Sequence, residues 1–519
     1  MKADNKKTLL IKNISNLITC NDLDKEYKNA FIYSVNGIIK DLGEMQYIKD
    51  EYNSANKIID ATNKVVYPGL INCHHHLYQT LSRNLPETQN MELFEWLDYL
   101  FKIWEKIDDD VVYYSAMVGL AELLKTGCTT TVDHMDSMPK GRSQNVMKMG
   151  FDAAEKLGIR LCMTRGSIDL TKEEGGTIPD GLVQTIDEIL TESEDAINNF
   201  HDGRINAMRN VILAPCSPFC CTKELMKKTV ELARKKGVRM HTHLCETKDE
   251  ENWTLEKYNQ RPLELMKEVG LIGEDVFYAH GIHFTDEEIQ ILANTKTGVS
   301  HCPTSNMKLA SGIMRMKEMR KMGVNIGLGV DGSASNDGSN MLEEMRHCFL
   351  LHRLNESHEA PSGYDILKMA TRGGAKLIGR KELGELSRDK ACDLFMIEKN
   401  KIEMVGCDYD FKSFLCTVGF KGLTEEEVMD ALISNDVDFV DLENEDGHIS
   451  IYGQPSDLYK IKEAITSVKS DIDFDIDEIS QLPKERITLT GEDLEIFNKL
   501  LTLLNEVDDV QNVYHNVNL

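Results

Sequence analysis

Short stretches of β-branched and aromatic residues, separated by polar turns, open the chain. The segments LLIKNIS, AFIYSVNGIIKDLG and IIDATNK alternate or cluster such residues. Asn36 and Gly37, inside the second segment, form the Asn-Gly pair that two-residue β-hairpin turns favour. Residues 1–66 are therefore predicted to form the first part of a small β domain.

From residue 65 onward, short apolar strands alternate with charged helical stretches such as DVVYYSAMVGLAELLKTG and KELMKKTVELARKKG. The predicted strands are residues 65–72, 129–134, 159–166, 210–216, 238–244, 276–281, 297–303 and 324–332. Eight strand–helix units in series predict an α/β fold, a (β/α)8 TIM-type barrel over residues 67–386. A doubly wound open sheet is the alternative, disfavoured because no glycine-rich phosphate-binding motif opens a helix.

Two further pieces complete the predicted organisation. Residues 387–422 return to the β pattern and are expected to join the N-terminal strands in a β-sandwich. Residues 423–519 form an α+β module in the prediction: a helix, a hairpin, a second helix, two strands and a last helix.

The 519 residues contain 59 Lys and Arg against 86 Asp and Glu, a net charge of −27. Residues 423–519 hold 24 acidic and 6 basic residues, hence −18 of that charge. Such a chain repels phosphate backbones and anionic membranes, so we expect no direct nucleic-acid binding. No apolar run reaches the roughly 18 residues of a membrane span. Thirteen cysteines without a CxxC pair predict reduced thiols and a cytoplasmic protein.

Histidines and carboxylates stand at the carboxyl ends of the predicted strands, where barrel enzymes place their chemistry. His74 and His76 in PGLINCHHH alternate along a strand end, so both can face the barrel mouth. Later strand ends, in HTHLCE, AHG and GLGVDGSASNDGS, add His243, Glu246, His280 and Asp331. Imidazole and carboxylate ligands suit Zn²⁺ or Fe²⁺. One such motif alone equally fits surface or core histidines, but four motifs at strand ends favour a metal site.

In this order the motifs resemble the amidohydrolase superfamily, and within it the mononuclear branch that acts on cyclic amidines. HHHLYQTLSR, LLKTGCTTTVDH, LAPCSPF, HTHLCET, HCPTSNMKLASG and GLGVDGSASNDGS are similar to the 8-oxoguanine deaminase group in particular, over about residues 1–422. Two-metal members carry a lysine late in the fourth strand, and VILAPCSPF (211–219) has none, so one metal is expected. Asn72 replaces the Asp of many members, as in the 8-oxoguanine deaminase group. That group continues with a further strand and a helix, whereas different sequence begins here near Leu423.

The resemblance implies that one divalent ion, Zn²⁺ before Fe²⁺, is held by His74, His76, His243 and Asp331. The ion would lower the pKa of a bound water and make hydroxide available at neutral pH. Asp331 would act as general base, Glu246 would protonate a ring nitrogen, and His280 would hydrogen-bond the hydroxide. The expected reaction is hydrolytic deamination of an aminopurine, with 8-oxoguanine to urate and ammonia as first choice. Guanine, isoxanthopterin and s-triazine substrates are the alternatives.

Three residues are candidate substrate contacts: Gln79, Arg165 and Cys216. Gln79 corresponds by resemblance to the amide that reads a purine edge in guanine deaminases. Arg165 ends the third predicted strand and fits a structural ion pair equally well, while Cys216 ends the fourth. Trp96 is predicted to pack its helix rather than to stack on a base. Supporting or core roles are expected for His134, His301, Asn306 and Asn336.

The acidic module resembles a second family. IYGQPSDLYKIKEAI, LPKERITLTGEDLEIFNKLL and DDVQNVYHN (508–516) are similar to the C-terminal portion of the YebC family of transcriptional regulators and translational activators. A regulatory protein with the barrel as scaffold is therefore the alternative from another class, and the intact ligand and acid–base positions favour the enzyme. The expected partner is a small purine-like substrate, and homo-oligomer formation is left open.

Overall fold

The structure, a computed structural model, describes residues 6–176, 178–401, 404–417, 441–445, 448–452, 458–468, 494 and 496–499. The chain divides into two compact units, Met1–Phe420 and Lys421–Leu519, and each is described by itself. The first unit contains a closed barrel and a separate sheet, and the second contains a hairpin and a helix.

The strands outside the barrel form one six-stranded sheet in the order β14-β5-β1-β2-β3, with β4 paired to β1. They are β1 (Thr8–Ile18), β2 (Glu26–Val35), β3 (Ile38–Glu44), β4 (Lys57–Asp60), β5 (Lys64–Pro68) and β14 (Leu394–Glu398). Asn36 and Gly37 join β2 to β3 with φ of 52° and 76°, the left-handed values that an Asn-Gly turn requires. β14 pairs antiparallel with β5, so both predicted segments contribute. Where the sequence predicted a sandwich, the described strands form a single sheet.

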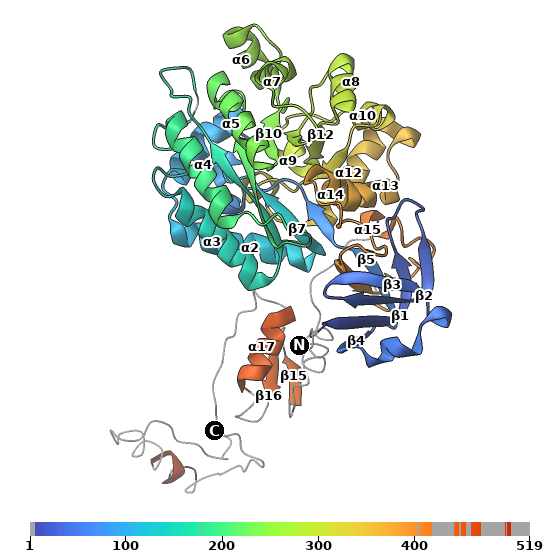
Figure 1. The fold of residues 1–519 in the computed structure, drawn as a ribbon. Helices are drawn as coiled ribbons and strands as arrows, with labels where there is room; N and C mark the ends of the chain where they lie inside the picture. Colours follow the sequence, from blue (N-terminus) through green and yellow to red (C-terminus); the bar gives the residue numbers. More distant parts are fainter. Residues whose placement is uncertain are drawn as a thin grey trace, which may run out of the picture. The chain divides into compact units, whose positions relative to one another are not determined.

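The predicted (β/α)8 barrel is confirmed: eight strands close in the order β6 to β13, each parallel to its neighbours, with helices around them (Figure 1). The strands are β6 (Leu70–Asn72), β7 (Cys128–Asp133), β8 (Arg160–Ser167), β9 (Arg209–Pro215), β10 (Met240–Leu244), β11 (Val276–His280), β12 (Gly298–His301) and β13 (Ile326–Leu328). Every one overlaps a predicted strand.

Several helices of the first unit begin at a capping side chain or end at a left-handed glycine. Thr185, Thr222 and Thr285 accept hydrogen bonds from backbone N–H groups at the starts of α4, α5 and α8. Left-handed glycines end α3, α5, α7 and α10. The helices are α1 (Leu93–Trp104), α2 (Asp109–Lys125), α3 (Ser143–Leu157), α4 (Ile186–Phe200), α5 (Lys223–Lys236), α6 (Lys248–Tyr258), α7 (Pro262–Val269), α8 (Asp286–Thr295), α9 (Pro303–Lys308), α10 (Met316–Met322), α11 (Ser333–Asn336), α12 (Met341–Glu356), α13 (Gly363–Lys368), α14 (Gly374–Leu377) and α15 (Phe414–Thr417).

Two predicted strands are shorter than their apolar runs. The first splits at Gly69 into β5, in the small sheet, and β6, in the barrel. A Cβ at Gly69 would lie 2.0 Å from Thr129 Oγ1, so the chain passes its neighbour too closely for a side chain. The last predicted strand forms only β13, and Asp331 lies three residues beyond it with a left-handed φ of 65°.

The described part of the second unit contains a hairpin of β15 (Asp441–Glu445) and β16 (His448–Tyr452), followed by α17 (Leu458–Val468). Both elements overlap their predictions. The helix predicted at 423–435 and the two strands predicted within 474–490 lie outside the described residues. Within the described ranges, no helix is long and apolar enough to cross a membrane.

Candidate metal centre

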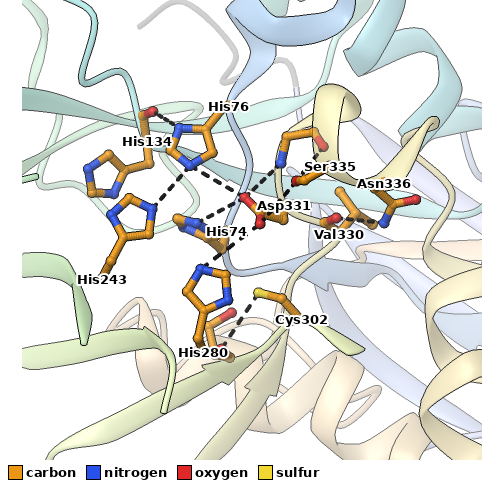
Figure 2. A network of polar contacts seen from close by, with 12 residues as sticks. His74, His76, His134, His243, His280, Cys302, Val330, Asp331, Ser335 and Asn336 are labelled. Carbon is orange, nitrogen blue, oxygen red and sulfur yellow. Dashed lines mark hydrogen bonds and ion pairs between the residues drawn. The ribbon is translucent and has the colours of Figure 1, made fainter. Parts of the chain in front are cut away.

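The predicted ligand residues meet at the carboxyl end of the barrel, although they come from three separate strands. His74 and His76 follow β6, His243 lies in β10, and Asp331 lies beyond β13. Figure 2 shows the rings of His74, His76 and His280 turned toward the carboxylate of Asp331. Parallel strands that end at one rim of a barrel bring residues far apart in sequence into one mouth.

The nitrogen and oxygen atoms that face the centre lie close together. Nε2 of His74 lies 3.2 Å from Asp331 Oδ1, and Nε2 of His76 lies 3.4 Å from the same oxygen. The Nε2 atoms of His76 and His243 lie 3.2 Å apart. A Zn²⁺ ion bound at 2.0–2.1 Å holds two imidazole nitrogens roughly 3.3 Å apart at tetrahedral angles. The observed separations therefore match a shared ion.

Outer hydrogen bonds fix which nitrogen of each ring faces the centre. His76 Nδ1 lies 2.7 Å from the carbonyl oxygen of His134, and His243 Nδ1 lies 2.7 Å from that of Cys216. A carbonyl only accepts, so each Nδ1 carries the proton and donates it. Each Nε2 is then left with a lone pair that points into the centre. Burial lowers the pKa of His243 to about 4, which keeps its ring neutral and able to bind a metal.

His74 reaches the same state through a second histidine, His241, that the sequence analysis did not select. His241 Nδ1 donates to the Phe277 carbonyl at 2.9 Å, so its Nε2 is an acceptor. That Nε2 lies 2.8 Å from His74 Nδ1, which must therefore be the donor. Burial lowers the pKa of His74 and of His241 well below the usual value, which keeps both rings neutral. The alternation of His241 and His243 in HTHLCE was the signal that could have identified it.

The surroundings of His74 Nε2 show whether a cation fits among these residues. This atom is buried and has no hydrogen-bond partner among the described residues, although it faces the Asp331 carboxylate. A lone pair aimed at a carboxylate is unfavourable unless a cation lies between them. Although burial opposes ionisation of Asp331, the nearby imidazoles of His74, His280 and His76 hold the pKa of the carboxyl well below its usual value. The donor set therefore fits one divalent ion.

Backbone geometry around Asp331 is held by its neighbours. Its carboxylate accepts from Gly332 N–H at 2.7 Å and from the Ser335 hydroxyl at 3.2 Å. Asn336 donates to the Val330 carbonyl at 2.6 Å and to Glu344 at 2.9 Å. These contacts hold a non-glycine residue in the left-handed region, a conformation that costs energy and is concentrated at functional sites. Asn336 thus has a supporting place beside the ligand, as the sequence analysis expected.

Glu246 and His280 lie beside Asp331 and line the same cavity. His280 Nε2 lies 3.5 Å from Glu246 Oε2 and 3.9 Å from Asp331 Oδ2. Asn306 Oδ1 lies 2.9 Å from His280 Nδ1, and an amide oxygen only accepts, so Nδ1 donates and Nε2 is free to accept. Burial, with the charge of Asp331 added, raises the pKa of Glu246 well above its usual value. The raised pKa makes Glu246 a candidate proton donor beside the carboxylate of Asp331, a pairing that can divide acid and base roles.

A cavity opens beside these residues. It is lined by His76, Tyr78, Gln79, Leu93, Trp96, Leu97, Phe101, Trp104, Asp136, Cys216, Ser217, Phe219, Cys220, His243, Glu246, His280, Leu309, Asp331 and Ser335. Gln79 Oε1 and Trp96 Nε1 are buried and lack hydrogen-bond partners among the described residues. The cavity is therefore lined by aromatic, apolar and polar side chains, two of which carry a buried polar atom without a partner in the described part of the chain.

The candidate substrate contacts separate into two groups. Gln79, on the 3-10 helix η3 (Leu77–Ser82), and Cys216 both line the cavity. Cys216 Sγ lies 3.4 Å from Asp136, which also accepts from the Tyr78 hydroxyl at 2.6 Å. Asp136, in the loop after β7, had no motif to mark it and was missed.

Arg165 lies elsewhere, in a buried ion pair. Its guanidinium donates to Glu192 and to Gln184, both at 2.6 Å, and it is not among the described residues that line the cavity. The ion-pair interpretation is the one that this geometry favours. Trp96 packs edge-on against Trp104 with ring centroids 5.3 Å apart, as expected for helix packing, and also lines the cavity.

The remaining expected histidines lie behind the centre. The His134 ring stands 4.5 Å from the His243 ring and 5.5 Å from the His74 ring, centroid to centroid. His301 contacts His352 rather than the centre. Alternation along the strand predicts that His75 points away from His74 and His76. Its Nε2 lies 2.9 Å from the hydroxyl oxygen of Ser339.

Known proteins are similar to this chain in sequence and in fold. The model of the "Amidohydrolase family" matches residues 65–435, and that of the "TACO1/YebC second and third domain" matches residues 395–517, as the resemblance of the acidic module predicted. An 8-oxoguanine deaminase of Pseudomonas aeruginosa is 43% identical over 347 residues, which are 67% of this chain and 77% of the relative. A hydroxydechloroatrazine ethylaminohydrolase of a Pseudomonas species is 37% identical over 73% of this chain and 79% of its own.

Among solved structures, the atrazine chlorohydrolase TrzN from Arthrobacter aurescens, complexed with zinc, superimposes with a TM-score of 0.76 at 27% identity. The superposition covers 89% of this chain and 99% of TrzN. The family match, over residues 65–435, covers all eight strands of the barrel. The chain belongs to the amidohydrolase family.

Proposed function

We propose that the chain is a hydrolytic deaminase of aminopurine-type cyclic amidines, with 8-oxoguanine as first substrate. In this reaction water adds at the C(–NH2)=N carbon, ammonia leaves, and a carbonyl remains. The observation that carries the proposal is the convergence of three imidazole lone pairs and one carboxylate beside a protonated Glu246. The relative at 43% identity, an 8-oxoguanine deaminase, supports the substrate.

The metal would be held by His74, His76, His243 and Asp331, and Zn²⁺ is the first choice. Neutral imidazoles and a carboxylate are ligands that Zn²⁺ accepts, and the similar TrzN structure contains zinc. When bound, such an ion supplies Lewis acidity and lowers the pKa of water from 15.7 toward about 7. Fe²⁺ accepts the same ligands and is the alternative.

Three residues of this chain would move or hold protons around the substrate. Asp331 is ionised and can accept a proton from water in the cavity. Glu246 is protonated and can donate to a ring nitrogen of the amidine. His280, its Nε2 held between Glu246 and Asp331, can accept a hydrogen bond from the attacking water. The two carboxyl groups thus have opposite protonation states at neutral pH, as an acid–base pair requires.

The cavity walls suit a flat heterocycle that presents both donors and acceptors. Gln79 Oε1 can accept from a ring or exocyclic N–H, and Trp96 Nε1 can donate to a ring carbonyl or nitrogen. A ligand that hydrogen-bonds to both atoms leaves neither of them buried and unpaired, a state that costs about 1–3 kcal/mol for each atom. A purine or pterin lactam edge carries this combination. The triazine relative at 37% identity keeps s-triazine amines as the second candidate.

The test combines metal analysis with an ammonia-release screen of the purified full-length protein. We expect a bound divalent ion at the mouth and ammonia release from 8-oxoguanine faster than from guanine, isoxanthopterin or an amino-s-triazine. Glu246→Gln serves as the control that separates enzymatic from background release. A protein with no bound metal and no turnover of any of these substrates would contradict the proposal and favour the regulatory alternative suggested by the YebC-like segment.

A further inference from the structure

A second cluster of buried side chains that can bind a metal lies between strand β12 and helix α12. His301 ends β12, and Cys348 and His352 lie four residues apart on α12, with Glu356 four residues further. Residues spaced by four share one face of a helix, so all three α12 side chains point the same way. His301, Cys348 and His352 are each 0% exposed. None of them is among the described residues that line the cavity.

One ligand atom of each of His301, Cys348 and His352 lies within 4.8 Å of the other two. The Nε2 atoms of His301 and His352 are 3.0 Å apart, close to the 3.2 Å between His76 and His243 at the mouth. Two imidazole nitrogens that share a Zn²⁺ ion stand roughly 3.3 Å apart at tetrahedral angles. A shift of a few tenths of an ångström therefore suffices for the two rings to share an ion.

Hydrogen bonds alone leave this cluster incomplete. His352 Nδ1 donates to Glu356 Oε1 at 2.9 Å, so His352 Nε2 presents a lone pair to the ring of His301. If His301 Nε2 donates to it, His301 Nδ1 is left buried and without a partner among the described residues. Glu356 Oε2 is unpartnered in the same sense. The hydrogen bonds among His301, His352 and Glu356 therefore do not satisfy all the polar atoms of the cluster, which costs free energy in a buried place.

The charges of the cluster also match a divalent cation. The Cys348 side chain becomes a thiolate on metal binding, and the proton that it loses goes to solvent. A thiolate and the Glu356 carboxylate together balance the two positive charges of the ion, which a buried site requires. Glu356 would hold the outer nitrogen of His352 as carboxylates do behind metal-bound histidines. Burial lowers the pKa of both imidazoles, which keeps them neutral.

We propose that His301, Cys348 and His352 bind a second divalent ion of the Zn²⁺ class, which joins helix α12 to strand β12. The site is structural, because its ligands are enclosed and none faces the cavity. Its ligand set differs from that of the mouth by containing sulfur. This difference makes the two sites separable by spectroscopy.

The experiment uses full-length protein produced in Co²⁺-supplemented medium, so that the ion is present while the chain folds. A thiolate bound to Co²⁺ gives a charge-transfer band in the near ultraviolet, and ligands made of nitrogen and oxygen do not. We expect this band, with about two metal ions per chain, in the wild-type protein. Cys348→Ser should abolish the band and reduce the count to about one ion. Its deamination rate should stay within about threefold of wild type, since the two sites are separate.

Two variants control for effects on folding. His352→Gln can still donate to Glu356 and accept from His301, so a purely hydrogen-bonded cluster tolerates it, whereas the proposed site loses a ligand and about one ion. Cys162→Ser removes an equally buried thiol outside the cluster, 2% exposed on β8, and should keep both the band and the second ion. The proposal is overturned if the wild type lacks the band, or if the band survives in Cys348→Ser. The proposed deaminase function would be contradicted by a different result, namely a wild-type protein that shows the band but has no turnover.

Discussion

The first unit contains two groups of buried histidines whose closest nitrogens are almost equally spaced. At the mouth, Nε2 of His76 lies 3.2 Å from Nε2 of His243; behind the wall, Nε2 of His301 lies 3.0 Å from Nε2 of His352. The groups differ in their outer contacts. At the mouth both outer nitrogens donate to backbone carbonyls, whereas behind the wall only His352 has an outer acceptor.

This difference shows what makes a cluster reactive rather than structural. Two fixed lone pairs that face each other cannot form a hydrogen bond, so the mouth needs a cation for electrostatic reasons. The mouth also opens on a cavity that contains Glu246, a carboxylic acid held protonated by burial. The residues His301, Cys348 and His352 are not among the described residues that line the cavity, so an ion held there would have no substrate beside it.

The largest expected effect comes from Asp331→Asn. The change removes an anionic ligand and the proposed general base, so turnover should fall by at least the 10²–10⁴-fold typical of losing acid–base catalysis. Metal analysis should show weaker binding of the ion at the barrel mouth, while the ion at His301, Cys348 and His352 stays bound. Retention of both activity and metal would show that the carboxylate is not a ligand. Asp337→Asn, a change at an exposed carboxylate after α11, is the matched control.

Glu246→Gln should come next, with a loss of about 10²–10⁴-fold in turnover and unchanged metal content. The amide keeps the shape of the side chain but cannot supply the acidic proton. Steady-state ammonia release measures the turnover, and metal analysis of the same preparation measures the metal content. If the metal is lost as well, Glu246 is a ligand rather than an acid, and the comparison between the clusters would need revision.

His241→Leu should lower the metal affinity of the mouth by about 10–100-fold, as losses of outer-shell partners do. Leucine fills similar space but leaves His74 Nδ1 without its acceptor, so the ring is free to change tautomer. Competition with a chelator measures the affinity, and excess metal should restore turnover. Equal affinity in the variant and the wild type would show that His241 does not orient His74.

The smallest of these effects is a pH dependence. Because burial raises the pKa of Glu246, the proton is present below that raised pKa and is lost as pH rises through it. Turnover should therefore be full at the lower pH and fall about tenfold per unit above the raised pKa. A profile of kcat against pH checks this limb, which should be absent in the residual activity of Glu246→Gln. The same limb in both proteins would assign it to another group.

The sequence predicted the barrel correctly, and it identified four residues that the fold brings together, because both depend on local patterns. Alternating apolar strands and charged helices predicted eight strands, and all eight overlap those observed. His74, His76, His243 and Asp331 were identifiable because each stands at a strand end within a motif, and such ends meet at one rim.

What the sequence could not provide depends on contacts between distant residues. The break at Gly69 follows from the close approach of Thr129, and the ion pair of Arg165 with Glu192 joins β8 to α4. His241 was missed because its role appears only when the partner of its outer nitrogen, the Phe277 carbonyl, is known. Cys348 and His352 carry a helical spacing in the sequence, yet nothing local shows that His301 faces them.

The most direct test of the central claim is anomalous diffraction at the zinc absorption edge from crystals of the active protein. The account predicts a peak about 2.0–2.1 Å from the Nε2 atoms of His74, His76 and His243, with an Asp331 oxygen at a similar distance. A fully active protein whose maps show no metal among these four side chains would contradict it.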